Sequence, residues 1–579
     1  MGMNASTDLT ELLSSGVDTS SDTDLSALLD NGTGAVSPEA LSVNPPVAGA
    51  AVAGGASYDG ASKIDRLINW SPPLRSADAD MLREKGSLDA RARDTLRNDA
   101  YVAGGDRQRK DSIVGAEYRL NAKPATKILW GKEDPTWESE FQEEIETLFA
   151  LDANSEQCWF DVSRKNTFTE LVRLNVGVHM AGGESLCVSQ WMKDDGRPFR
   201  SALQMVDADR LSTPMSVIGL NQSKIRNGVL RDRWGAPKAY FIRNEHPNEG
   251  AFSDFANDRY TWERVPARTP WGRLRVCHIF ETMRPDQTRG LAEIVTALTE
   301  CRMTKHFRKT ELERAVLAAS YAMSIESEFP DNILDAMGGD VPVGENASVA
   351  WMTSYLEAIA SYSAGARNLH MDGTKIPVFA PGTSLKIQNP GGKSPMGDKY
   401  EQSLLRYIAA ALGVSYEELS RDFTQTNYSS ARAAFGLTWK TMQTLKKMVA
   451  DRFANFAYRL WLEELINNNQ VESLKRRNVP KYYEGRNAEA YSQCEWIGAG
   501  QGQIDPLKET QASILKIKAG LSTKEIEIAK MSGGDWRATA RQISRERAED
   551  EFYKNPSIYD TADTTDVTNS LTATPSDGE

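Results

Sequence analysis

Cysteine is scarce in this 579-residue chain, and its few copies are widely separated. They form no CxxC pair, the spacing that zinc sites and redox motifs use. An odd number of scattered cysteines predicts buried or incidental thiols in a reducing compartment rather than a disulfide framework. The cysteines are Cys158, Cys187, Cys277, Cys301 and Cys494.

Long apolar runs are also missing. No segment approaches the roughly 18 apolar residues needed to span a bilayer. The N-terminus has no basic stretch followed by an apolar one, so we expect no signal peptide and no membrane association. These absences predict a protein that is made in a cytoplasm.

Recognisable catalytic motifs are absent as well. The segment 390–394 resembles the end of a phosphate-binding loop, but Ile387 stands where that motif needs its first glycine. Residues 498–502 lack the last glycine of a dinucleotide fingerprint and are interpreted as a flexible turn. There is no HExxH, no zinc spacing and no GxSxG elbow. We therefore predict no catalytic, cofactor or metal site, and interpret the scattered histidines as structural: His179, His246, His278, His306 and His370.

The net charge of -12 argues against a protein that coats nucleic acid, because neutralising phosphates requires an excess of lysine and arginine. Composition alone favours an ordinary soluble acidic protein. It also allows a ring that surrounds DNA without gripping it, since an acidic wall repels phosphates and lets a duplex slide.

The first 65 residues are interpreted as a disordered acidic arm, because 1–62 contain no lysine or arginine and little apolar surface. Within the arm, TDLTELLSSG at 7–16 is echoed by TDLSALLDNG at 23–32. Each copy places three leucines on one helix face: Leu9, Leu12, Leu13 and Leu25, Leu28, Leu29. The echo is either chance similarity in biased sequence or a duplicated motif that folds on binding a shell or assembly protein.

The rest of the chain predicts an α+β protein. Apolar spacing predicts helices over 91–102 and 137–151. From Leu171 to Phe280 the pattern alternates and is punctuated by Gly, Pro and Asp, which predicts strands and turns.

The second half predicts long helices. One helix is expected over 291–324, and the Gly- and Pro-rich insertion 325–395 then suggests a small domain at the tip of a stalk. A further long helix is expected over 431–466, with Ser429 and Ser430 as candidate N-caps.

Residues 400–435 predict a helix, a turn, a polar loop and a second helix. Gly413 suits the end of the first helix, where a left-handed residue is needed. Ser415 and Glu418 have the spacing of a capping box. The loop that follows has no apolar periodicity, so we expect it to be presented at a surface rather than buried in a core.

The C-terminal part predicts short helices. Asp505 followed by proline is typical of a helix start, and Ser522 with Glu525 predicts the cap of the next helix. From about residue 550 the tail becomes acidic and rich in Thr and Ser, which predicts disorder.

Several blocks in order resemble the portal proteins of lambda-like tailed phages. Together they span roughly residues 66–545, and the insertion and both ends match less clearly. The blocks are 70–73 (WSPP), 91–102, 161–171, 228–242, 278–290, 400–433 and 494–523.

This resemblance implies a portal fold with a mixed α/β wing, a two-helix stem, a small clip and a helical crown. It implies an arm (1–65), a wing (66–290), stem helix 1 (291–324), a clip (325–395), stem helix 2 (396–413), a tunnel loop (414–432), a long wing helix with further wing (433–504), a crown (505–548) and a disordered tail (549–579).

The resemblance also implies a function. Such a protein forms a ring, usually of twelve subunits, at one capsid vertex, and double-stranded DNA is packaged and ejected through its centre without sequence preference. The expected partners are the terminase large subunit, the major capsid protein, a scaffold or assembly protein and a head–tail connector protein. The expected location is the virion, after assembly in the host cytoplasm.

Two sets of residues are candidates for contact with DNA. The tunnel-loop candidates are Arg421, Asp422, Phe423, Thr424, Gln425, Thr426, Asn427, Tyr428 and Ser429. Phe423 and Tyr428 form either an aromatic constriction or a packing contact with a neighbouring subunit. The basic stem face is Arg302, Lys305 and Lys309, which is either a solvated or shell-facing surface or a ring of positive charge facing DNA.

Two other functions stay open on the sequence. One is a motor or nuclease enzyme of the packaging machine, against which the missing phosphate loop and acidic metal site argue. The other is a different structural ring, such as a head–tail adaptor, although those chains are usually much shorter.

Overall fold

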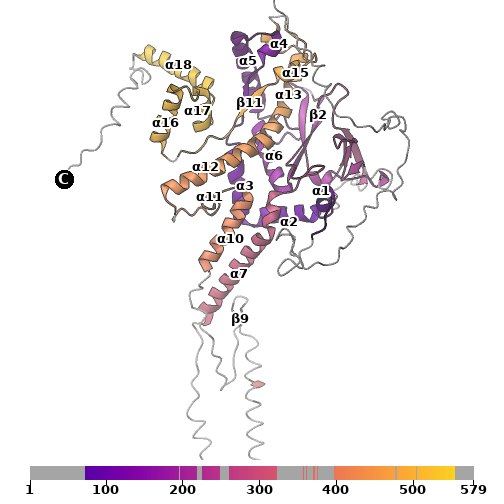
Figure 1. Cartoon of the computed structure of the whole chain (residues 1–579), viewed down its shortest axis with the longest axis vertical. Coiled ribbons are helices and arrows are strands. Elements are labelled where there is room, and N and C mark those ends of the chain that lie inside the picture. The colour runs from indigo at the N-terminus through magenta and orange to yellow at the C-terminus, as the bar shows by residue number, and fades with distance from the viewer. Residues whose placement is uncertain are drawn as a thin grey trace, which may run out of the picture. The chain divides into compact units, whose positions relative to one another are not determined.

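The computed structural model describes most of the chain between Pro72 and Lys554 (Figure 1). The described residues are 72–194, 196–217, 224–247, 249, 260–321, 357, 360–361, 370–371, 374–375, 397–424, 426–475, 479–503 and 505–554. The chain divides into two units, Met1–Leu74 and Arg75–Glu579, and all named elements lie in the second. The leucine repeats of the arm, most of the clip and the tail beyond residue 554 lie outside the described residues.

Three helices open the second unit: α1 (Ala77–Met81), α2 (Lys85–Asn98) and α3 (Ala100–Ile113). The single helix predicted over 91–102 is wrong, because the backbone is extended at Asp99. The Asp99 side chain accepts hydrogen bonds from the N–H groups of Tyr101 and Val102 and starts a new helix there.

The core of the predicted wing, called the wing core below, combines helices with a small two-stranded sheet. Strand β1 (Arg119–Ala122) pairs antiparallel with β11 (Cys494–Ile497), so segments far apart in sequence close one body. Short helices lie nearby in the chain: α4 (Thr126–Trp130), α14 (Glu472–Lys475) and α15 (Asn487–Tyr491). Helix α5 (Pro135–Ala153) confirms the helix predicted over 137–151.

The strand-rich region begins later than predicted. Leu171 lies inside helix α6 (Phe168–Gly182), which Thr167 and Glu170 start with a full capping box. Strand β2 (Glu184–Trp191) follows directly, and β3 (Ser201–Val206) and β8 (Val276–Phe280) pair with it antiparallel in the order β3-β2-β8.

A second antiparallel sheet has the order β4-β5-β6-β7. Its strands are β4 (Ile225–Arg226), β5 (Val229–Arg231), β6 (Pro237–Arg243) and β7 (Trp262–Pro266). The short helices η5 (Ala208–Arg210) and η6 (Met215–Val217) lie between the two sheets in sequence. Leu186 and Val188 of β2 share one apolar core with Tyr240 and Val265, so the two sheets pack face to face.

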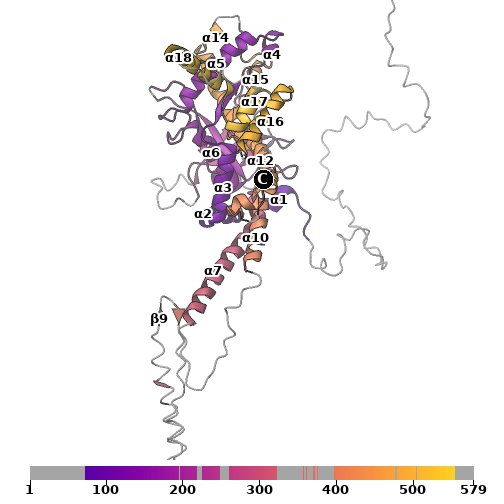
Figure 2. The same ribbon diagram turned by 90° about the vertical axis from the view of Figure 1, so that its left-hand side faces the viewer.

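The predicted stem is built from two helices. The 3-10 turn η8 (Glu293–Ala297) leads into α7 (Leu298–Tyr321), and α10 (Gly397–Leu412) returns beside it (Figures 1 and 2). Arg308 donates to Glu401 Oε1 at 2.6 Å across the pair. Between these helices the described residues include the short strands β9 (His370–Met371) and β10 (Thr374–Lys375), which pair antiparallel.

The long helix predicted over 431–466 has three parts. They are α12 (Tyr428–Leu445), a π-helical segment η10 (Lys446–Ala450) and α13 (Asp451–Asn467). Its predicted inner face is buried from Met442 onward, whereas Phe435 and Trp439 are only half-buried. Trp461 packs edge-on against Phe149 at 5.2 Å between ring centroids in the main core.

The predicted crown contains α16 (Pro506–Lys518), α17 (Lys524–Ser532) and α18 (Trp536–Tyr553). Asp505 caps α16 as predicted, but Thr523 rather than Ser522 caps α17, because its hydroxyl accepts from Ile526 N–H. Helix α18 continues past residue 548, into the predicted tail. None of the described helices is both long and apolar enough to cross a membrane.

The glycine-rich segment 498–502 differs from the flexible turn predicted for it. A methyl group added at Gly498 would lie 2.5 Å from the Ile113 carbonyl oxygen, and one at Gly500 would lie 2.7 Å from Gly533 N. Glycine is required because two backbones approach closely there, so this connection is tightly packed.

Candidate functional site

The predicted tunnel loop joins α11 (Tyr416–Ser420) to α12 and has defined ends. Gly413 has a φ of +67° after α10, and Ser415 and Glu418 form the capping box of α11, as predicted. Arg421 ends α11 in the left-handed conformation, with a φ of +59°. Its guanidinium donates to Gln108 Oε1 on α3 at 3.2 Å, which ties the loop to the wing.

Hydrogen bonds shape the loop itself. The Asp422 carboxylate accepts from the N–H of Thr424 at 3.0 Å and from its hydroxyl at 2.6 Å, and these bonds lower the pKa of Asp422. The predicted caps Ser429 and Ser430 are wrong, because Asn427 is the N-cap of α12 and its Oδ1 accepts from Ser430 N–H at 2.8 Å. Gln425 lies outside the described residues.

The loop side chains are largely exposed. The exposed fraction is 48% for Phe423 and 48% for Tyr428. The Phe423 ring lies 6.2 Å from that of Phe435 on α12, measured between centroids, so within one chain it has an aromatic neighbour. Thr424 and Ser429 are exposed too. The loop therefore offers hydroxyl, amide and aromatic groups to whatever lies beside it.

A buried polar anchor lies where α12 meets the wing core. The Lys446 ammonium, in the π-helical segment, donates to Asp451 Oδ1 at 2.8 Å and to the Trp496 carbonyl at 2.8 Å. The Tyr118 hydroxyl also donates to Asp451. Burial, together with the Asp451 charge, raises the pKa of Tyr118 well above its usual value, so this hydroxyl keeps its proton. These buried hydrogen bonds therefore hold the C-terminal end of α12 against the wing core.

The basic stem face is exposed as a set. Arg302, Lys305 and Lys309 all have exposed side chains on α7. Lys305 also donates to the Asn98 carbonyl at 3.2 Å, and Lys309 lies 3.7 Å from Glu313. The three cations lie on one helix but have different local partners.

Sequence reasoning missed a buried ion cluster at the base of the stem. Glu184 is fully buried, and its carboxylate accepts from Arg289 Nη2 at 2.5 Å and from Gly290 N–H at 3.0 Å. Lys85 lies 3.2 Å from the same carboxylate, and His278 Nε2 lies 3.0 Å from it. Burial raises the pKa of Glu184, but Arg289 and the other donors outweigh burial and hold it well below the usual range.

This cluster joins distant segments. Lys85 lies on α2, Glu184 on β2, and Arg289 directly before the stem begins. No spacing pattern in the sequence predicts this cluster, because only the fold brings its residues together. The one available signal was a charged residue at the first position of a strand, β2.

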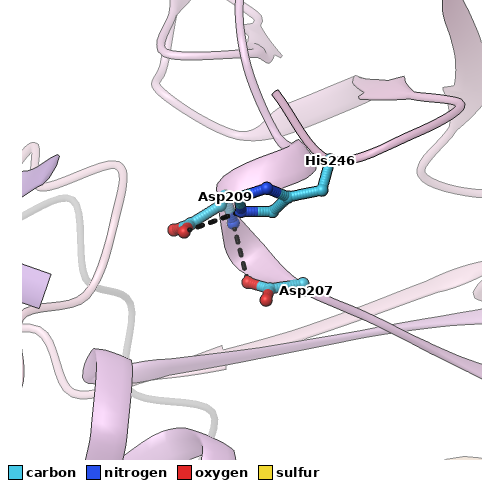
Figure 3. A group of neighbouring side chains, drawn as sticks. All are labelled: Asp207, Asp209 and His246. Atoms are coloured by element: carbon cyan, nitrogen blue, oxygen red, sulfur yellow. Dashed lines mark hydrogen bonds and ion pairs between the residues drawn. The ribbon is translucent and has the colours of Figure 1, made fainter. Parts of the chain in front are cut away.

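One group of potential metal ligands occurs among the described residues: Asp207, Asp209 and His246 (Figure 3). Their ligand atoms lie within 4.8 Å of one another, and His246 Nε2 lies 3.3 Å from Asp209 Oδ2. Arg93 already pairs with both carboxylates, and its Nη2 donates to Asp209 Oδ1 at 3.0 Å. The group is therefore an ion-paired cluster rather than a convincing metal centre.

Known proteins give a consistent match. A profile of phage portal proteins of the lambda family matches residues 63–446. The chain is 35% identical to portal protein B of Escherichia phage lambda over 497 residues, which cover 86% of this chain and 89% of that protein. It is 34% identical to the portal protein of Escherichia phage N15 over the same shares. It is 23% identical to a probable portal protein of Halomonas phage phiHAP-1, over 83% of this chain and 84% of that one.

Among solved structures, the chain resembles a subunit in the neck of an empty gene transfer agent particle. That likeness has a TM-score of 0.36 at 14% identity and covers 77% of this chain and 92% of the other.

Proposed function

Because the chain belongs to the lambda family of phage portal proteins, we propose that it forms the channel through which double-stranded DNA enters and leaves a capsid. Portal proteins are structural ring proteins rather than enzymes, so the family match argues against the alternative that this chain is a motor or nuclease of the packaging machine. The observation that carries the proposal is 35% identity to a phage portal protein over nearly the whole length of both chains.

In the proposed ring, twelve copies surround a central channel at one capsid vertex. The clip at 325–395 would dock the terminase large subunit during packaging and a head–tail connector protein afterwards. The wing would contact the major capsid protein and a scaffold or assembly protein. Assembly would occur in the host cytoplasm.

We assign the loop from Arg421 to Ser429 to the channel wall. Two observations support this assignment: its described side chains are largely exposed, and its ends are held to α3 and the wing core. Hydroxyl and amide groups contact phosphates without reading sequence, and a neutral surface lets a duplex slide. If these bonds hold the loop in the same position in every subunit, the channel has the same width all around the ring.

We assign the basic stem face to DNA as well, rather than to the capsid shell. Arg302 and Lys309 have exposed side chains on α7, whereas Lys305 donates to the Asn98 carbonyl and Arg308 pairs with Glu401. Repeated around a ring, these cations would form a positive belt within an otherwise acidic protein.

The leucine repeats at 7–16 and 23–32 are proposed to bind a shell or assembly protein. Their spacing would form one apolar helix face in each copy. Deleting both repeats should reduce incorporation of the ring into capsids. Unchanged incorporation would remove this part of the proposal.

The ring itself can be tested by imaging and by mass. Electron micrographs of the purified protein should show closed rings with an axial channel, and the mass of the assembly gives the copy number. An ATPase assay should show no turnover. A protein that stays monomeric under every assembly condition would contradict the proposal, as would a ring too narrow for a duplex.

The loop assignment can be tested with one charge. Ser429→Lys would add a ring of cations to the proposed channel wall and should slow DNA packaging, because phosphates would then bind the wall. Ser544→Lys makes the same change on exposed helix α18 and serves as the control. Equal packaging rates for the two variants would place the loop away from DNA.

A further inference from the structure

One hollow lined by described residues lies outside the predicted tunnel loop and the two stem helices. It is a cleft of about 1200 Å³ between α13, strands of both wing sheets and the segment 482–489. Its inner wall is apolar and aromatic, because Tyr240, Phe456 and Tyr482 are buried there. An occupant would therefore have to bury some apolar surface as well as meet the charges at the rim.

The rim of the cleft is strongly cationic. The only acidic residues among its described lining are Glu463 and Glu489. The basic residues that line it are Arg231, Arg268, Arg273, Lys447, Arg452, Arg459 and Arg486. The lining of the cleft thus carries an excess of positive charge, whereas the whole chain has a net charge of -12. Such a concentration of one sign favours an anionic occupant.

Several of these cations lack internal partners. Arg452 and Arg459 lie on α13 with exposed side chains, and no described residue forms a hydrogen bond or ion pair with either of them. The ion pairs of Arg231 and Arg273 are long, at 3.9 Å to Asp78 and 3.6 Å to Glu463, and the Arg273 guanidinium also lies 5.3 Å from the centre of the Trp271 ring. The Nε atoms of both are buried without a hydrogen-bond partner. Buried donors of this kind are usually satisfied by some group.

One edge of β8 borders the same cleft. Ser189 N–H donates to the Arg275 carbonyl at 2.9 Å, so by antiparallel alternation residues 277 and 279 are those that exchange hydrogen bonds with β2. At the start of the strand the opposite edge is occupied, because the N–H groups of Arg275 and Val276 donate to the Ala267 carbonyl at 2.9 and 3.4 Å. The N–H and C=O groups of His278 and Phe280 therefore point away from β2. No described backbone group is bonded to them, and β8 has no second strand neighbour among the described strands.

The cleft runs along this edge rather than across one face of the sheet. Val276, Cys277 and His278 all line it, although consecutive strand residues point to opposite faces. An extended segment lying here could continue the ladder of β8, while its side chains reach the arginines on one side and the apolar wall on the other.

We propose that this cleft binds an extended acidic segment of a partner protein, which adds a strand to the unpaired part of the β8 edge, at His278 and Phe280. Duplex DNA is a poor fit for two reasons. Its sugar–phosphate backbone cannot form the hydrogen bonds of a strand edge, and the duplex is too wide to reach the apolar inner wall of the cleft. Helix α5 of a second copy, which carries the exposed acids Glu140 and Glu143, fits poorly too, because its backbone groups already bond within the helix.

The test uses the assembled full-length protein and a fluorescent peptide that alternates glutamate and valine. Binding is followed by anisotropy. We expect saturable binding that Arg452→Glu with Arg459→Glu weakens at least tenfold. The control variant, Lys132→Glu with Lys518→Glu, makes the same charge change on exposed lysines outside the cleft and should bind normally.

Strand addition is tested separately. Replacing the central valine of the peptide with proline removes one backbone donor and should weaken binding about tenfold, since proline cannot join a ladder. Three results would overturn the proposal: no saturable binding, equal loss in both protein variants, or displacement of the peptide by a DNA duplex at lower concentration than by unlabelled peptide. If the double variant fails to assemble, Arg459→Gln gives the same comparison with a milder change.

Discussion

The role of the buried Glu184 carboxylate can be tested by a substitution that removes its charge. Replacing it with glutamine keeps the shape of the side chain but removes the charge. Arg289 and Lys85 would then remain buried at the base of the stem, with exposed side-chain fractions of 2% and 4%. Lys85 keeps Asp89 at 2.9 Å, whereas Arg289 loses its only carboxylate partner among the described residues.

The size of the effect follows from this geometry. Breaking a buried ion pair by removing one partner costs about 3–5 kcal/mol. The new amide would also turn donors toward Gly290 N–H or the guanidinium, so part of the hydrogen bonding is lost. We expect Glu184→Gln to lower the free energy of unfolding by about 3–5 kcal/mol at pH 7.

The assay is urea unfolding followed by circular dichroism, and the control is Glu140→Gln, at an exposed position of α5. The pKa of Glu184 is depressed, so its stabilising effect is present above the ordinary carboxyl value of 4.5 and is lost as the pH falls below it. The difference between variant and wild type should therefore shrink in acid. A loss below about 1 kcal/mol at pH 7 would refute the idea that this charge holds the joint together.

Three further predictions concern other sites. Arg302→Glu with Lys309→Glu should leave ring assembly intact, because both side chains are exposed, but should impair DNA packaging or retention; normal packaging would count against a role facing DNA. Trp439→Ala should cost about 1–2 kcal/mol by thermal unfolding, less than the roughly 3–5 kcal/mol expected of a fully buried indole; a larger loss would show that the side chain is covered in the assembly. Burial raises the pKa of Glu146 to about 7, so stability falls as the pH rises from about 4.5 to 7, and Glu146→Gln should be more stable than wild type at pH 8 but not at pH 4; equal stability at both values would contradict that reasoning.

Local signals in the sequence predicted local structure well. The capping box of Ser415 and Glu418, the left-handed Gly413 and the start of α16 at Asp505 all depend on residues within a few positions of one another. Errors arose where two signals compete. Ser522 and Thr523 are both good caps, as are Asn427 and the serines after it, and only the tertiary path of the chain selects one.

Long-range features were beyond such reasoning. The packing of Gly500 against Gly533 joins loops that are distant in sequence, so a tight contact was mistaken for a flexible turn. The ion cluster at Glu184 and the cationic cleft likewise gather residues from several strands and helices. The assignment of residues 414–432 as a tunnel loop stays a prediction from the family resemblance, because the composition of this segment alone indicated only exposure.

The two joints that carry the stem and the loop share one physical device. At the stem base Glu184 binds Arg289 and Gly290 N–H, and at the loop helix Asp451 binds Lys446 and Tyr118, all in buried positions. Apolar residues of similar size would often be as stable there, because buried ion pairs lose much of their gain to desolvation. Apolar contacts, however, tolerate small rotations, whereas a buried carboxylate is satisfied in only one arrangement of its donors. A closed ring requires the same interface angle in every copy, and an error repeated around the ring would prevent closure. In the proposed ring, these polar joints would therefore fix the angle of the predicted stem and loop to the predicted wing, as a channel of uniform width requires.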